Sequence, residues 1–105
     1  MKIPLSKPFE YEDLSLTEID LDFDKAKTNV LLRADKEMAR RKHVPPVKQM
    51  DTTYCLLIAS YISDLNYNVL CELPLVDGNN VATMVSGFLL GAAETEMETP
   101  TEAAT

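Results

Sequence analysis

The residues that most often carry catalysis are few in this sequence and stand apart from one another. The only histidine, His43, lies beside two prolines in a predicted loop, and the two cysteines, Cys55 and Cys71, each lie within an apolar stretch. Nucleophilic catalysis needs an activated Ser, Cys or Lys next to a base, and this spacing pairs no nucleophile with the imidazole. The three glycines form no phosphate-binding loop and no dinucleotide fingerprint. We predict that the chain is not an enzyme and uses no cofactor.

Carboxylates are plentiful, but their spacing favours neither acid–base catalysis nor metal binding. Glu10 and Glu12 lie in a polar connection with no apolar surroundings that would raise a pKa, so we expect them to be solvated. Asp20, Asp22 and Asp24 lack the glycine and the final glutamate of a calcium loop. The cysteines have no C-x-x-C spacing, and a metal held by them would need further ligands. We expect no metal, and reduced cysteines inside the core.

The charge of the chain argues against nucleic acid as a partner. Its formal net charge is -7, which repels a phosphate backbone. The basic cluster Arg40, Arg41 and Lys42 is most simply the solvated carboxyl end of a helix, although a docking patch for an acidic partner stays open. The longest apolar stretch, Tyr54–Ile62, is short of the roughly 20 residues of a membrane span. No signal peptide is evident, so we expect an intracellular protein without a membrane role.

The amino-terminal part of the chain has the alternation of extended structure. Apolar residues alternate with polar ones through Lys2–Phe23, and the phase slips once, which suggests a bulge near Thr17–Glu18. The segment Pro8–Asp13 would turn the chain and give a two-stranded antiparallel hairpin. Because a lone hairpin is marginal in water, helices or a second subunit must cover its apolar face.

Two longer helices are predicted next. Asp22 or Asp24 would cap an amphipathic helix over Lys25–Arg41, and the prolines that follow His43 forbid its continuation. Asp51 and Thr52 would cap a second helix that runs to Ile62 and is apolar on nearly every side. Two short helices and a hairpin can scarcely enclose such a helix, so we expect it to share its burial with another subunit.

The remaining residues predict a short helix, a final helix and a tail. Asn66 would cap Tyr67–Leu73, and Asp77 would cap a helix over Asn79–Leu90 that Gly91 ends. The fold class is therefore α+β, a two-stranded antiparallel hairpin followed by three to four helices. We predict one domain over residues 1–91 and a disordered acidic tail over residues 92–105.

The apolar faces of the second and last helices are candidates for contact with a partner, although packing on the domain's own core is as plausible for the last one. The partner-binding residues predicted on these faces are Tyr54, Leu57, Ile58, Tyr61, Val81, Met84, Val85 and Phe88.

In the order of its elements the chain resembles the small tail assembly chaperones of contractile-tailed bacteriophages and prophages. The resemblance covers about Ile3–Gly91. Members of the family typically begin with a proline-containing short strand and a second strand that ends in an acidic turn, matched here by Ile3-Pro4-Leu5 through Asp13–Thr17. The closing part is the most similar: the stretch Glu72–Asp77 matches the family's Leu-Pro-x-x-Asp step, and Val85–Leu89 matches a final helix that ends in a Phe-Leu pair. One departure is Gly78, which begins a Gly-Asn-Asn run where the family more typically has an aromatic or aliphatic residue.

The resemblance implies a function in protein assembly. A chaperone of this family binds the long helical tape measure protein and keeps it soluble until tail tube subunits polymerise around it. It also implies contact with the tail tube protein, a longer frameshifted form of the chain, homo-oligomers, location in the host cell cytoplasm and absence from the mature virion. Two alternatives remain, a structural or adaptor subunit retained in the particle, or a small regulatory protein whose basic cluster touches nucleic acid.

Overall fold

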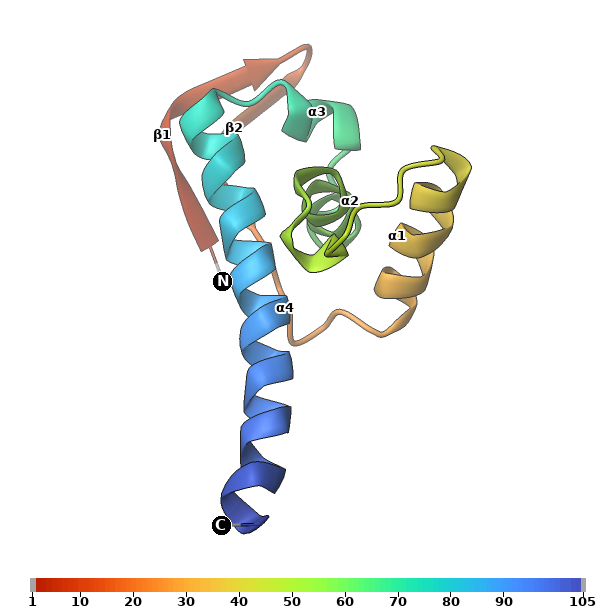
Figure 1. The fold of residues 1–105 in the computed structure, drawn as a ribbon. Coiled ribbons are helices and arrows are strands. Elements are labelled where there is room, and N and C mark those ends of the chain that lie inside the picture. The colour runs from red at the N-terminus through yellow and green to blue at the C-terminus, as the bar shows by residue number, and fades with distance from the viewer. Residues whose placement is uncertain (1, 105) are drawn as a thin grey trace.

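The computed structural model describes the backbone of residues 2–104 and the side chains of residues 2–91. Strands β1 (Lys2–Tyr11) and β2 (Leu14–Asp20) form an antiparallel hairpin, and a helical region follows. The helical elements are α1 (Asn29–Arg40), the 3-10 turn η1 (Lys48–Met50), α2 (Thr52–Ser63), α3 (Tyr67–Cys71) and α4 (Leu75–Ala104). Figure 1 shows α2 at the centre, with α1 on one side and α4 on the other. The predicted α+β class, a hairpin followed by helices, is confirmed.

The hairpin contains an irregularity in β1, whereas the sequence pattern predicted it in β2. Pro4 pairs with Glu18 and Phe9 pairs with Leu16, so four residues of β1 face the single residue Thr17 of β2. The slip in phase therefore lies opposite Thr17 as expected, but the extra residues belong to β1.

The turn of the hairpin is also tighter than predicted. After the irregularity β1 resumes its alternation, with Phe9 packed against the core and its ring stacked 6.4 Å from that of Tyr11. The chain then reverses at Glu12 and Asp13, and Glu12 takes a left-handed conformation with φ 54°. The prediction that all of Pro8–Asp13 forms the connection is wrong, because Phe9 and Tyr11 can bury apolar surface only by staying in the strand.

Helix α1 begins later than predicted. Its first residue is Asn29, and neither Asp22 nor Asp24 is its cap. The carboxylate of Asp22 instead accepts the N–H of Lys25 at 3.3 Å, in a turn that precedes the helix. Burial explains the delay, since Leu21 is fully buried and packing of the chain around it holds this stretch outside a helix.

Helix α1 ends in a hydrogen-bonded cap before the prolines are reached. Lys42 is left-handed, with φ 58°, and its N–H donates to the Ala39 carbonyl at 3.0 Å. The N–H of His43 donates to the Met38 carbonyl, also at 3.0 Å. This pair of bonds is the Schellman arrangement, in which two otherwise unpaired carbonyls of the last turn are satisfied.

Helix α2 is the centre of the core. Asp51 caps it as predicted, because its side chain accepts the N–H of Tyr54 at 3.0 Å. Seven consecutive residues, from Tyr54 to Ser60, are buried, and α1, α3, α4 and η1 all contact the helix. The expectation that α2 would share its burial with another subunit is wrong, because the chain's own helices surround it.

The last two helices differ from prediction in their limits. Asn66 caps α3 as expected, with its side chain accepting the N–H of Asn68 at 2.8 Å. Helix α4 begins at Leu75, and Gly91 lies within it rather than ending it. The predicted acidic tail at residues 92–105 lies outside the residues whose side chains are described.

Asp77 lies inside the first turn of α4 and does not cap it. Its side chain is 1% exposed, and it accepts two hydrogen bonds from Ser6 of β1, from the N–H at 2.9 Å and from the hydroxyl at 3.0 Å. These bonds fasten the irregular part of the hairpin to α4. A carboxylate at this end of a helix is also favoured by the helix dipole.

Candidate partner-binding surfaces

The only histidine takes part in a structural contact. His43 Nε2 lies 2.9 Å from Oδ1 of Asp51, whose other oxygen caps α2. One carboxylate thus joins the loop after α1 to the start of α2. Within the described part of the chain, no three His, Cys, Asp or Glu side chains gather as a metal site would require.

The two cysteines have different surroundings. Cys55 is buried in α2 and its thiol donates to the Gln49 carbonyl at 3.4 Å. Burial, together with the charge of Asp51, raises the pKa of this thiol to about 11. Cys71 is free and exposed, so the prediction that both cysteines are core residues is right for Cys55 and wrong for Cys71.

The eight predicted partner-binding residues differ in how far the fold buries them. Five are buried in the chain's own core, and Tyr61 is partly exposed. Met84 and Phe88 of α4 are 37% and 43% exposed. The five buried residues are Tyr54, Leu57, Ile58, Val81 and Val85. Only Tyr61, Met84 and Phe88 are therefore accessible to a partner in this fold.

Phe88 forms one wall of an apolar groove. Its ring stacks on that of Phe23, with centroids 4.1 Å apart and planes 9° from parallel. Beside this pair is a cavity of about 220 Å³ that Leu31, Ile62 and Leu89 also line. We call these five residues the α4 groove. Sequence patterns found Phe88 but not the groove, because Phe23 comes from a segment that was expected to be strand.

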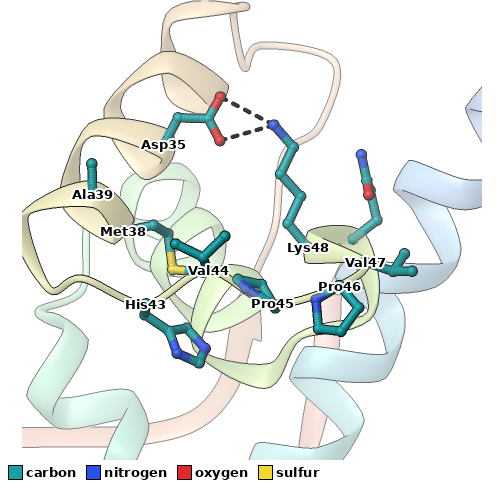
Figure 2. A pocket seen from close by; sticks show the side chains of 10 residues that line it. Asp35, Met38, Ala39, His43, Val44, Pro45, Pro46, Val47 and Lys48 are labelled. Atoms are coloured by element: carbon teal, nitrogen blue, oxygen red, sulfur yellow. Dashed lines mark hydrogen bonds and ion pairs between the residues drawn. The ribbon is translucent and has the colours of Figure 1, made fainter.

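A second apolar surface lies on the loop between α1 and η1. Val44 is 89% exposed, and with Pro45, Pro46 and Val47 it lines an open hollow of about 430 Å³ whose other side includes Met38. We call these four loop residues the proline-loop surface. Figure 2 shows Val44 beside Met38 of α1, with the other loop residues following along the chain toward Lys48.

An ion pair stands at one end of this hollow, and His43 lies at the other. Lys48 Nζ lies 3.0 and 3.2 Å from the two carboxylate oxygens of Asp35, on the side opposite His43 (Figure 2). The hollow is therefore apolar in its middle and charged at its rim. In the sequence, only the pair of prolines marks this hollow.

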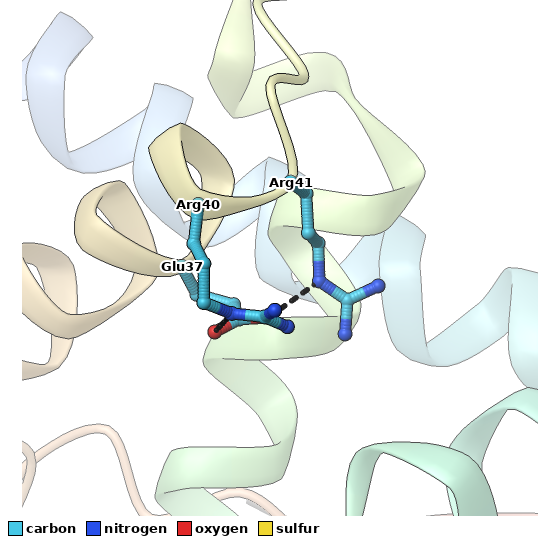
Figure 3. A network of polar contacts seen from close by, with 3 residues as sticks. All are labelled: Glu37, Arg40 and Arg41. Atoms are coloured by element: carbon cyan, nitrogen blue, oxygen red, sulfur yellow. Dashed lines mark hydrogen bonds and ion pairs between the residues drawn. The ribbon is translucent and has the colours of Figure 1, made fainter.

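The basic cluster is partly neutralised by one acid. Glu37 accepts hydrogen bonds from Arg40 and from Arg41 (Figure 3), and the two guanidinium groups lower the pKa of Glu37 to about 2. Arg41 also lies over the ring of Tyr67, 4.7 Å from its centroid, and Arg33 lies 4.1 Å from the ring centre of Tyr61. These contacts attach α1 to the residues around the carboxyl end of α2.

Comparison with known proteins adds no relative to this picture. No family model, no curated protein and no solved structure matches the chain. Among the described residues, no helix has the length and apolar character needed to cross a membrane.

Proposed function

We propose that the chain is a bacteriophage tail assembly chaperone that binds the tape measure protein and keeps it soluble for tail tube polymerisation. Two things support this proposal. The first is the resemblance of the sequence to that family, which spans the hairpin and all the helices through Gly91. The second is the α4 groove, where apolar side chains remain accessible although the core of the domain is complete.

The α4 groove is the observation that carries the proposal. Phe88 and Met84 project from one helix, and the cavity beside Phe88 offers room for a side chain from outside. A partner helix presents apolar side chains at intervals of three and four residues, and such a helix can place one of them in the cavity and another against Met84. Aromatic residues at the centre of an interface commonly carry much of its binding energy.

The charge of the chain fits the same role. A tape measure helix with uncovered apolar stripes aggregates, and a bound protein with a net charge of -7 keeps the complex dispersed by repulsion. Binding must also be reversible under this proposal, so that tube subunits can displace the chaperone. Under this proposal the chain acts in the host cell cytoplasm and is absent from the finished particle.

The test is coexpression with the tape measure protein of the same phage. We expect the tape measure protein to be soluble and to co-purify with the chain, and to lose both properties with Phe88→Glu or Met84→Glu. Leu75→Glu is the matched control, because Leu75 is an exposed apolar residue at the other end of the same helix. Circular dichroism checks that each variant is folded, and Met84→Glu keeps the test valid if loss of the Phe23 stacking unfolds Phe88→Glu.

Two results would contradict the proposal. One is a tape measure protein that is equally soluble without the chain. The other is the presence of this chain in purified particles by mass spectrometry, which would instead favour a structural or adaptor subunit.

A further inference from the structure

The proline-loop surface is not used by the fold or by the proposed function. Three of its four residues are exposed to solvent, and the side chain of Val44 lies almost wholly in water. An exposed apolar surface beside an open hollow is typical of a docking site when a partner of matching chemistry is present. The charges around the hollow indicate what that chemistry is.

The stretch from Asp35 to Asp51 is the basic part of an acidic chain. It contains five of the ten Lys and Arg residues but only three of the seventeen acids. Each of these three acids is already paired: Asp35 with Lys48, Glu37 with two arginines, and Asp51 with His43.

Two cations remain available. Among the described residues, Lys36 and Lys42 have no acidic partner, and both are exposed. Each is next in sequence to a residue that lines the hollow, Lys36 to Asp35 and Lys42 to His43. An apolar side chain flanked by acids is therefore the ligand that this surface fits.

The chain itself contains such a ligand. Residues 92–105 have four glutamates and no lysine or arginine, and their one large apolar residue, Met97, stands between Glu96 and Glu98. Methionine is flexible and fills irregular apolar hollows well. The glutamates next to it in sequence give the segment a negative charge that complements Lys36 and Lys42.

We propose that the acidic segment 92–105 of one copy binds the proline-loop surface of a second copy. Met97 occupies the hollow, and the neighbouring glutamates face Lys36 and Lys42. The segment comes from another molecule because the carboxyl-terminal end of α4 extends away from the domain, beyond the part of the helix that contacts η1 (Figure 1). This inference does not depend on the α4 groove and can hold or fail separately from the proposed function.

The first experiment measures self-association of the full chain by analytical ultracentrifugation. We expect association that strengthens with protein concentration at about 0.15 M salt, where the repulsion between two chains of net charge -7 is screened beyond about 8 Å. A chain that stays monomeric at this salt and at several hundred micromolar protein overturns the proposal.

The second experiment uses two sets of variants. The surface variant combines Val44→Ser with Lys36→Gln and Lys42→Gln, and the tail variant combines Met97→Ser with Glu96→Gln and Glu98→Gln. We expect each alone to associate at least about tenfold more weakly than the parent chain, a loss equal to about 1.4 kcal/mol. An unchanged association constant for either variant overturns the proposal.

Mixing the two variants identifies the contact. The tail of the surface variant and the loop of the tail variant are both intact, so an equimolar mixture must associate more strongly than either variant alone. A mixture that stays monomeric shows that the two changes act on separate contacts and overturns the proposal. Val76→Ser and Lys27→Gln are matched controls, since they remove an exposed apolar residue and an exposed cation elsewhere and are expected to leave association unchanged.

Discussion

At the scale of single residues, Asp77 shows how a familiar local signal can serve a distant contact. An Asp shortly before an apolar helical stretch normally predicts a cap, and this reasoning was right for Asp51 and for Asn66. Asp77 has the same appearance, yet its carboxylate is committed to Ser6, 71 residues away. Local patterns span three or four residues, so no sequence rule could have found that pairing.

We predict that Asp77→Ala destabilises the domain by about 2 kcal/mol, because it removes two hydrogen bonds to a buried charged group and leaves the Ser6 N–H without its acceptor. Ser6→Ala removes only the hydroxyl bond and should cost about 1 kcal/mol or less. Urea unfolding of the two variants measures both values. If Asp77→Ala unfolds at the same urea concentration as the parent chain, the contact has no part in stability.

The candidate site was only partly predictable at this scale. Phe88 and Met84 were identified from their helical spacing, and they are accessible. Val81 and Val85 lie on the same stripe but point into the core, because α4 packs one side of that stripe against α2. A stripe on a helix shows which residues are apolar but not which of them the rest of the chain covers.

At the scale of elements, the carboxyl end of α1 includes a residue whose backbone conformation is energetically unfavourable. Lys42 is in a left-handed conformation that non-glycine residues adopt at a penalty of about 1 kcal/mol or more. The Schellman bonds of Lys42 and His43 hold it there. Lysine at this position is therefore suboptimal for the backbone, although its charge lies where the helix dipole favours a cation.

Replacement of Lys42 by glycine is expected to stabilise the domain by about 0.5 kcal/mol, since relief of the left-handed strain exceeds the entropy that glycine adds to the unfolded chain. Lys42→Ala is the control for loss of charge alone, and it should be neutral or slightly destabilising. Ala39→Gly, within the same helix, should destabilise by about 1 kcal/mol. Thermal unfolding ranks all three, and a Lys42→Gly variant no more stable than Lys42→Ala contradicts the prediction.

The elements themselves were largely predictable from periodicity. The stripe Val30, Ala34 and Met38 is buried as the four-residue spacing indicates. The extent of α1 was overestimated because Ala26 continues the same spacing, whereas packing around Leu21 keeps the preceding stretch out of the helix. Element identity thus followed from sequence, and element limits followed from tertiary contacts.

At the scale of the whole molecule, α2 stays buried only while the elements around it are in place. It has four neighbouring elements, and composition alone could not show that a chain of 105 residues supplies enough of them to cover it. The predicted range of the last helix, Asn79–Leu90, leaves out its first turn, where Asp77 joins α4 to Ser6 of β1. With α4 beginning at Leu75 and joined to β1, the domain closes around α2.

The two cysteines allow this closure to be measured. Cys71 should react with a thiol reagent at about the rate of an unfolded peptide, whereas Cys55 should react at least about a hundredfold more slowly, because its thiol is buried and its pKa is raised to about 11. Mass spectrometry of labelled peptides distinguishes the two sites, and Cys71→Ser isolates the slow one. In denaturant both should react alike, and rapid labelling of Cys55 in the native protein would mean that α2 opens locally.

The hydrogen bonds between Ser6 and Asp77 also constrain the order in which the molecule can be completed during synthesis. The strand that leaves the ribosome first has its final anchor in a helix that leaves among the last, and Val81 and Val85, which close over the core, emerge later still. Until then the nascent chain carries α2 with one side bare. A chain that terminates prematurely before α4 is therefore expected to yield a fragment that cannot bury its own central helix.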